Sequence, residues 1–219
     1  MSPSRPPSSR SEPQAGERAH KRVDQGLRTR ARLIEEAARL FARDGYAGVS
    51  TQAVLDATGV TRGALYHHFD DKQALFEAVF TETCATIERR IMEGAAGTSY
   101  VGGLISGCLV FLRECVDPSI TRIYLVDGLA VLGWKLWWEI DSRHTLAALE
   151  HGVDAACEEA GIDDPALRKG LFTLISGALN AAALRAANAA DPAAEVRELE
   201  PAVERLIRGA LIRNGLGQG

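Results

Sequence analysis

The sequence lacks the cysteine patterns on which zinc sites and disulfide frameworks depend. Its 219 residues include only four cysteines, which form no C-x-x-C pair and have no histidine at ligand spacing beside them. We therefore expect neither a metal site nor a cofactor. The cysteines are Cys84, Cys108, Cys115 and Cys157. Cys108 and Cys115 lie seven residues apart, so they would share a helix face, which leaves a redox-sensing role open as an alternative to simple burial.

Long apolar runs are missing as well. No apolar stretch of the secretory type follows the first residue, and the longest later run, Val101–Leu112, spans twelve residues interrupted by glycines. A membrane-spanning helix needs about 20 consecutive apolar residues. The sequence therefore indicates a protein that is neither exported nor membrane-spanning, and we expect it in the cytoplasm.

Proline is scarce except near the first residue. Four of the eight prolines, Pro3, Pro6, Pro7 and Pro13, lie there among Ser, Arg and Gly. Because this stretch offers almost nothing to bury, we expect residues 1–26 to form a disordered basic tail.

Charge is divided unevenly along the chain, although the net value is only −4. Residues 1–43 carry ten Lys or Arg against five Asp or Glu, whereas residues 44–219 carry fifteen against twenty-four. The net negative charge does not argue against DNA binding, because DNA contacts depend on where the positive charge lies in the chain. The tail and the first helix would supply phosphate contacts, although a solubilising leader explains the residues before Gly26 equally well.

Signatures of catalysis and of β-structure are not found. No nucleophile elbow, phosphate loop, paired metal ligands or glycine-rich dinucleotide motif occurs, so we expect no enzyme. Apolar residues repeat with a helical period, which predicts an all-α fold. We place one helical domain at 27–76 and a second at 77–219. The expected helices are Leu27–Arg43, ended by Gly45, then two short helices within 50–69, then Asp70–Glu93, Tyr100–Val116, Pro118–Leu125, Leu129–Ala160, Ala166–Asn188 and Asp191–Asn214.

Residues 50–75, STQAVLDATGVTRGALYHHFDDKQAL, hold two short helix patterns around a glycine turn. The first helix can start at Ser50 or Thr51, whose side-chain oxygens accept from free backbone N–H groups. Gly59 ends this helix, because glycine adopts the left-handed backbone common at a helix C-terminus. Thr61 caps the helix that follows. This layout is typical of a helix-turn-helix DNA reader.

The second short helix is predicted to turn its polar side outward. Leu65 and Phe69, four residues apart, share the inward face. Such a helix fits the DNA major groove, where arginine pairs bidentately with guanine and glycine lets the backbone approach closely. The residues on its other sides are Arg62, Gly63, Tyr66 and His67.

A third helix follows directly. Asp70 and Gln73 form a D-x-x-Q pattern that is typical of a capping box. Lys72 falls in the first turn, where the helix dipole disfavours a cation. We therefore expect an outside anion, a DNA phosphate, to compensate its charge.

The last two expected helices carry broad apolar faces rich in small side chains. Two such helices from each of two chains can bury these faces as a four-helix bundle about a two-fold axis. Packing within one chain is the alternative. Because a two-fold reader of near-palindromic DNA needs dimerisation, the helix-turn-helix and these two helices support each other.

Residues 29–80, TRARLIEEAARLFARDGYAGVSTQAVLDATGVTRGALYHHFDDKQALFEAVF, resemble the N-terminal domain of the tetracycline-repressor (TetR) family. The resemblance rests on the F-x-x-x-G-Y element at 41–46, the turn at 58–61 and the G-x-L-Y-x-H-F signature at 63–69. Leu55 and Thr58 depart from the family pattern, in which alanine is common at both positions. Both are packing positions beside the turn, so the fold is not in doubt.

The resemblance implies a homodimeric transcriptional regulator, usually a repressor, whose C-terminal domain binds a small molecule and thereby changes the distance between its two DNA-reading heads. By position in the family motif, Tyr66 and Lys72 would contact phosphates of a near-palindromic operator. The residues that would contact DNA are Thr51, Gln52, Thr61, Arg62, Gly63, Tyr66, His67 and Lys72.

The C-terminal part is only weakly similar to family members, although the tract DGLAVLGWKLWWEID at 127–141 is similar to one that recurs in a branch of the family. All three tryptophans lie in it at helical spacing. Aromatic walls with a few polar groups suit a small apolar or aromatic effector, although the rings could equally be ordinary core or dimer surface. The candidate ligand-binding residues are Cys108, Phe111, Tyr124, Trp134, Trp137, Trp138, His144 and Phe172, with Arg122 and His151 as further polar candidates.

Overall fold

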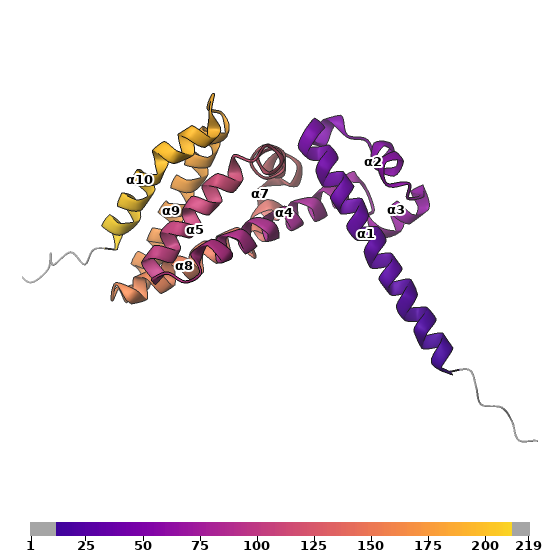
Figure 1. Cartoon of the computed structure of the whole chain (residues 1–219), viewed down its shortest axis with the longest axis horizontal. Coiled ribbons are helices and arrows are strands. Elements are labelled where there is room, and N and C mark those ends of the chain that lie inside the picture. The colour runs from indigo at the N-terminus through magenta and orange to yellow at the C-terminus, as the bar shows by residue number, and fades with distance from the viewer. Residues whose placement is uncertain (1–11, 212–219) are drawn as a thin grey trace, which may run out of the picture.

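The computed structural model describes residues 12–211, with side chains from residue 21 onward. Over these residues the chain forms only helices, turns and short irregular segments, with no strand, which confirms the all-α expectation (Figure 1). The helices are α1 (Glu12–Gly48), α2 (Thr51–Thr58), α3 (Arg62–His68), α4 (Lys72–Ala95), α5 (Tyr100–Cys115), α6 (Pro118–Ile120), the π-helix η1 (Thr121–Asp127), α7 (Gly128–Asp141), α8 (Thr145–Glu159), α9 (Pro165–Ala187) and α10 (Pro192–Ala210).

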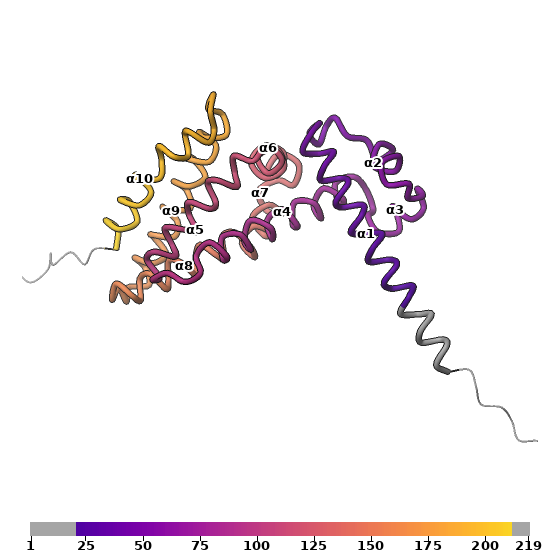
Figure 2. Tube along the Cα trace, viewed as in Figure 1, coloured from indigo at the N-terminus to yellow at the C-terminus, as the bar shows by residue number. Residues whose placement is uncertain are grey.

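Two parts of the molecule are joined by α4. We call α1, α2 and α3 the head, and the helices from α5 to α10 the body. The trace in Figure 2 follows α4 from the head at one end of the molecule to the far side of the body. Phe76 near the start of α4 packs edge-on against Phe41 of the head, with ring centroids 5.3 Å apart, whereas Ile87 and Ile91 are buried in its later turns. The helix therefore ties the two parts into one continuous core.

The first helix begins earlier than the sequence predicted. α1 starts at Glu12, so residues 12–26, expected in a disordered tail, continue the helix predicted from Leu27. Residues 1–11 lie outside the described part. Pro13 falls in the first helical turn, where proline is tolerated, and the Ala, Gln, Glu, Lys and Arg that follow are good helix formers. Gly45 interrupts the helix with φ 72° and ψ 165°, as expected of the residue predicted to end it.

The single helix predicted over Leu129–Ala160 is also wrong, because the chain breaks into α7 and α8. Asp141 ends α7 with its side chain fully buried. His144 then leaves the helical region at φ −128° and ψ −97° before α8 begins. The turn places Asp141 and Thr145 together, and this buried polar contact depends on residues far away in sequence. The stretch expected as one helix over Pro118–Leu125 divides into α6 and η1.

The remaining boundaries agree closely with the expectation. α5 and α9 begin and end within one residue of the predicted positions. Asp164 and Asp191 cap α9 and α10 by accepting from backbone N–H groups, and each is followed by a proline at the first helical position, where proline costs no hydrogen bond. The predicted end of α10 near Asn214 lies outside the described residues.

Candidate DNA interface and ligand cavity

The turn between α2 and α3 has the caps that the sequence predicted. Ser50 Oγ accepts a 3.1 Å hydrogen bond from Ala53 N. Gly59 ends α2 at φ 66°, in the left-handed region. Thr61 Oγ1 accepts from Ala64 N at 3.3 Å and so starts α3. Local side-chain chemistry therefore fixes the angle between the two helices.

One face of α3 is held by the core and the other is open. Leu65 is fully buried and Phe69, which caps the helix, is 4% exposed. A Cβ added at Gly63 would meet nothing within 4 Å, so the protein itself does not require glycine there. A surface that comes close to the backbone from outside would require it. The residues exposed on this open face are Arg62, Gly63, Tyr66 and His67.

The start of α2 contributes less to the same open surface. Thr51 is half-buried, whereas Gln52 is exposed and donates to Asp56 Oδ1 at 2.8 Å. Arg62, by contrast, has no hydrogen bond or ion pair to any described residue. Its guanidinium is therefore available to an outside partner without breaking an internal contact.

Asp71, rather than Asp70, caps α4, and this corrects the predicted capping box. Asp71 has extended backbone angles and its Oδ1 accepts from Ala74 N at 2.8 Å. The helix thus begins at Lys72, one residue later than the D-x-x-Q reading implied. The choice between two adjacent aspartates depends on where the preceding turn leaves the backbone, which the pattern does not encode.

Lys72 also has partners that the sequence did not reveal. Its ammonium donates to the carbonyl oxygens of Tyr46 at 2.7 Å and Val49 at 2.8 Å. It lies 4.0 Å from the centre of the Tyr46 ring, a favourable cation–π position. Carbonyl oxygens within the protein therefore already compensate this charge, and Lys72 ties the end of α1 to the start of α4. The contact of Lys72 with a DNA phosphate stays a prediction.

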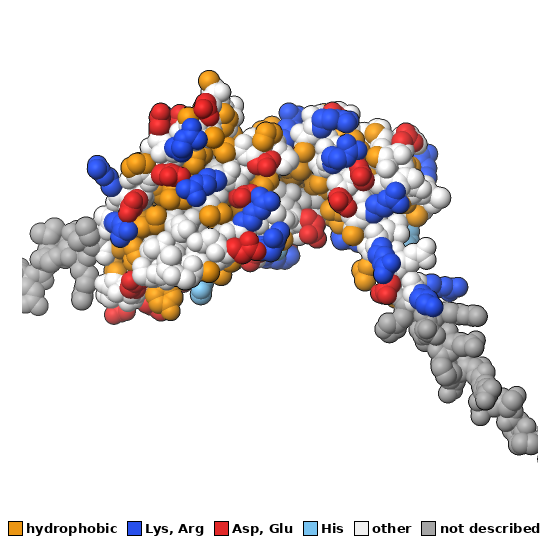
Figure 3. Space-filling view, viewed as in Figure 1, with side chains coloured by type: hydrophobic (Ala, Val, Ile, Leu, Met, Phe, Trp, Pro, Cys, Tyr) orange, Lys and Arg blue, Asp and Glu red, His pale blue; other side chains and the backbone are white. Residues whose placement is uncertain are grey.

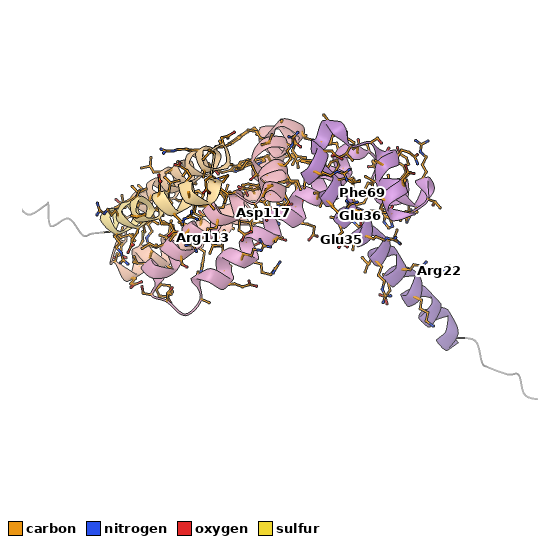
Figure 4. All side chains as sticks on the ribbon, turned by 45° about the horizontal axis from the view of Figure 1, so that its top comes forward. Arg22, Glu35, Glu36, Phe69, Arg113 and Asp117 are labelled. Carbon is orange, nitrogen blue, oxygen red and sulfur yellow. The ribbon has the colours of Figure 1, made fainter. Side chains whose placement is uncertain are left out.

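Arg30 of α1 is a further basic residue near α3 that sequence reasoning missed. Its guanidinium lies over the Phe69 ring, 5.3 Å from the centroid. Figure 3 shows Lys and Arg side chains over the head and along α1, and Figure 4 shows Arg22 on the part of α1 that projects past Phe69. Arg30 precedes the buried Ile34 and Ala37 by four and seven residues. This helical spacing was the sequence signal that could have placed Arg30 on the same side of α1.

The body contains a cavity of about 390 Å³ between α4, α5, α8 and α9. Of the predicted ligand-binding residues, Cys108, Phe111, Tyr124 and His151 line it. Its other walls come from residues that the sequence did not single out, among them Leu104, Thr145, Leu146, Leu149 and Asn180. These are ordinary core-type residues in sequence, so only the packing identifies them.

The tryptophans and three other candidates do not line this cavity. Trp134 and Trp138 are 63% and 41% exposed. Trp137 is buried beside Tyr124, with ring centroids 6.4 Å apart, and His144 bonds Glu88 through Nδ1 at 2.7 Å. These residues lie outside this cavity, to which α7 contributes no lining residue. Helical spacing alone could not show that α7 packs away from it. Phe172 packs against the core without reaching the cavity, and Arg122 lies at the junction with the head.

A buried polar cluster lies behind one wall of the cavity. Tyr124 donates to Asp141 Oδ1 at 3.0 Å, and the Thr145 hydroxyl donates to the same oxygen. Asp141 Oδ2 has no hydrogen-bond partner among the described atoms. Burial raises the pKa of Asp141, against the lowering effect of the Thr145 and Tyr124 hydrogen bonds. Tyr124 also stacks on Phe80 at 5.8 Å, which fixes the direction of its hydroxyl.

The cysteines lie in surroundings that disfavour the reactive thiolate. Burial raises the pKa of Cys108 to about 12 and raises that of Cys115 further. A thiolate is the nucleophile in thiol oxidation, so both groups are expected to be inert. In the described part of the chain, no group of three or more His, Cys, Asp or Glu is placed to hold a metal ion.

Head and body meet at η1, a contact that the sequence did not predict. Asp127 Oδ2 accepts from Tyr46 N at 2.7 Å and from Arg122 Nε at 3.2 Å. Gly45 adjoins this contact, and a Cβ there would lie 2.1 Å from Arg122 Nη2. Its left-handed φ of 72° and this close approach both require glycine. Tyr124, which lines the cavity, belongs to the same π-helix as Asp127.

Comparison with known proteins gives two family matches. Residues 33–79 match the family described as "Bacterial regulatory proteins, tetR family". Residues 101–210 match "Tetracyclin repressor-like, C-terminal domain". The first match covers the helix-turn-helix, and the second covers most of the body, including the cavity-lining helices α5, α8 and α9.

Solved structures and curated proteins agree with these matches. A TetR-family transcriptional regulator from Pectobacterium atrosepticum is 31% identical, with a TM-score of 0.72 over 87% of this chain and 97% of that one. The structure of RolR in complex with resorcinol is 17% identical and shares the fold, with a TM-score of 0.63 over 90% of this chain and 98% of that one. The transcriptional repressor AcnR of Corynebacterium efficiens is 39% identical over 70 residues, which are 32% of this chain and 37% of that protein.

Proposed function

Because this chain belongs to the TetR family of bacterial regulatory proteins, we propose that it is a cytoplasmic, homodimeric repressor that leaves its DNA operator when a small molecule enters the cavity. The family consists of helix-turn-helix transcriptional regulators rather than enzymes. The observation that carries the proposal is the open face of α3. There Arg62, which has no partner among the described residues, lies beside Gly63 on a helix whose other face is fixed by Leu65 and Phe69.

On the operator, α3 lies in the major groove. Arg62 donates two guanidinium N–H groups to O6 and N7 of a guanine, and Gly63 allows the helix backbone to approach the base edges. Tyr66 contacts a phosphate, and Lys72 retains one N–H for the same purpose beyond its two carbonyl bonds. The remaining DNA contacts come from Thr51, Gln52, Thr61 and His67.

A second copy of the chain covers α9. Between residues 170 and 184 this helix has no charged side chain, and its exposed side carries a stripe of Leu and small residues. Leu174 at 72% and Leu184 at 46% are too exposed for core residues. A Cβ added at Gly170 or Gly177 would meet nothing within 4 Å, so the stripe is flat enough for a partner helix to approach closely. Leu206 of α10, 52% exposed, extends the apolar surface.

The other apolar side of these helices packs within the chain. Ile175 and Leu179 of α9, with Val203 and Ile207 of α10, are buried against the rest of the body. α9 is also long and apolar enough to cross a membrane by length and composition, with 22% of its most apolar window buried. The match over 101–210 to a repressor C-terminal domain favours a protein partner for the remaining face.

The effector acts through η1. Ligand in the cavity touches Tyr124, and three residues later Asp127 accepts from the Tyr46 N–H of the head. A ligand that prefers another position of η1 thus prefers another position of the head. Its effect is limited to its differential affinity for the two states, about 1–3 kcal/mol in typical coupled systems. RolR, which shares the fold, was crystallised with resorcinol, and this supports a small-molecule site in this architecture.

The proposal is tested by selecting bound fragments from a genomic library and measuring their affinity alongside the mass of the protein in solution. We expect a dimer that binds a near-palindromic site. Ala178→Glu, in the exposed α9 stripe, should give monomers with weak operator affinity, whereas the control Ala190→Glu, on the exposed turn before α10, should remain dimeric. A wild-type monomer, or a dimer that binds no fragment above background, would refute the proposal.

A further inference from the structure

The walls of the cavity carry no fixed charge. Among its lining residues, all within the described chain, there is no Asp, Glu, Lys or Arg. His151 is the one lining side chain that can carry a charge near neutral pH, and it is exposed. A charged group bound at the buried walls would therefore give up its hydration without gaining a partner, which is strongly unfavourable. The deep walls are apolar, formed by Leu104, Phe111, Leu146 and Leu149. A cavity of about 390 Å³ falls in the range that holds small organic ligands.

The polar cluster behind the wall adds a directional requirement. Tyr124 and Thr145 both line the cavity, and both give their hydroxyl protons to Asp141 Oδ1. Each hydroxyl oxygen therefore retains lone pairs but has no proton left to donate. Toward the cavity this pair acts as a hydrogen-bond acceptor. A ligand gains there by offering an O–H or N–H group.

Asp141 also determines which charges are disfavoured. Its side chain is fully buried and one of its oxygens lacks a partner, so an anion next to Tyr124 and Thr145 would meet a carboxyl group instead of a counter-ion. A cation cannot pair directly with it, because the two hydroxyls stand between Asp141 and the cavity. Burial also raises the pKa of Asp141 and so disfavours its negative charge.

We propose that the effector is an uncharged molecule with an alkyl or aryl body and one hydroxyl or amide N–H donor, which bonds the Tyr124 and Thr145 oxygens at the deep wall. This inference rests on the proposed function, since it assigns the chemical class of ligand for the regulatory cavity. Tyr124 and Thr145 are the buried polar side chains of the lining. The other polar lining side chains are exposed, as in Thr98, Ser99, Tyr100 and His151, or half-buried, as in Ser176 and Asn180. The acceptor pair is therefore the feature that selects the ligand.

Four probes with the same alkyl chain test this assignment on the full-length protein: 1-octanol, octyl methyl ether, octanoate and octylammonium. Binding is measured by calorimetry and by the shift in melting temperature near neutral pH. We expect 1-octanol to bind roughly tenfold tighter than each of the other three, since only it joins a donor to an uncharged group. Equal or tighter binding of a charged probe, or of the ether, would overturn the assignment.

Two threonine variants locate the effect. Thr145→Val should remove the preference for 1-octanol over the ether, because it removes half of the acceptor pair. Thr81→Val is the control, since Thr81 of α4 does not line the cavity and its hydroxyl bonds its own helix at Glu77 O. Loss of the preference in both variants, or in neither, would contradict the role of Thr145. If Thr145→Val does not fold, Tyr124→Phe, which removes the other oxygen, makes the same test.

The ligand-free protein separates this inference from the proposed function. Operator binding and dimer mass are measured before any probe is added. If both are normal and none of the four probes binds, the ligand class is wrong while the assignment as a DNA-binding regulator stands. If operator binding or the dimer is missing from the start, the proposed function itself fails.

Discussion

The backbone N–H of Tyr46 donates a 2.7 Å hydrogen bond to Asp127 Oδ2, across 81 residues of sequence. This bond joins the last residues of α1, just past the break at Gly45, to the π-helix η1, whose Tyr124 lines the cavity. Arg122 bonds the same oxygen at 3.2 Å and lies against Gly45. The contact is enclosed, since the Asp127 side chain is only 13% exposed.

Asp127→Ala should weaken operator binding to all sequences alike. The substitution leaves the Tyr46 N–H without an acceptor, which costs about 1–3 kcal/mol for a buried group, and it frees the head from η1. Unfolding in urea measures the loss of stability, and gel shifts on specific and random DNA measure affinity. Asp127→Asn retains an acceptor oxygen and should fall between the wild type and Asp127→Ala. Unchanged stability and affinity in Asp127→Ala would show that this contact does not position the head.

Arg62→Ala and Lys72→Ala should fail in different ways. Arg62 has no partner among the described residues, so its loss should leave the melting temperature unchanged and reduce discrimination between operator and random DNA by about 1–3 kcal/mol. Lys72 bonds the Tyr46 and Val49 carbonyls, so its loss should lower both the melting temperature and the affinity for every sequence.

Lys72→Met serves as the control for this pair, because it keeps an apolar stem over the Tyr46 ring but donates no hydrogen bond. It should resemble Lys72→Ala in DNA binding with a smaller fall in melting temperature. A Lys72→Ala protein as stable as the wild type, with only a flatter salt dependence, would restore a purely phosphate-binding role for this lysine.

Asp141 should make the protein less stable as the pH rises. Burial raises its pKa in the folded state above the ordinary value of 3.8, so the folded protein holds a proton that the unfolded chain releases. The stability from this proton is fully present below the ordinary pKa and is lost as the pH rises toward the folded-state pKa. As the pH rises, the unfolding free energy of the wild type should therefore fall relative to that of Asp141→Asn. A difference that stays constant from acid to neutral pH would contradict a raised pKa.

Thiol chemistry should not control DNA binding. Cys84, Cys108 and Cys115 are buried, and burial raises the pKa of each. We expect slow reaction with a thiol reagent in the folded protein, fast reaction in denaturant, and no change of operator affinity after mild peroxide treatment. Cys115→Ser should bind the operator like the wild type. A peroxide-induced loss of binding that Cys115→Ser or Cys108→Ser abolishes would restore the redox alternative.

Features set by neighbouring residues were predictable from the sequence. The caps Ser50 and Thr61 and the turn at Gly59 act within a few positions, and the inward placement of Leu65 and Phe69 follows from helical spacing. The predicted exposure of Arg62, Gly63, Tyr66 and His67 on α3 was therefore confirmed. Asp70 and Asp71 show the limit of such reasoning, because both fit a cap and only the backbone angles distinguish them.

Features set by distant contacts were not predictable. The break after Asp141 depends on Tyr124, seventeen residues earlier, and on the burial of both. The cavity depends on how α5 and α8 pack together. The prediction therefore included the exposed Trp134 and Trp138, which do not line it, and omitted apolar residues such as Leu104, which does. The junction of Asp127 with Tyr46 had no sequence signal, since an aspartate at a helix boundary usually acts as a local cap.

The most direct test of the account is a footprint of the protein on its strongest genomic site, with wild type and Arg62→Ala compared at equal occupancy. Two α3 helices of one dimer should protect two symmetric blocks one helical turn apart, about 34–36 Å between centres. Methylation of one guanine in each block should impair binding by the wild type but not by Arg62→Ala. A single protected block, or identical guanine dependence in both proteins, would contradict the placement of Arg62 in the major groove of a two-fold operator.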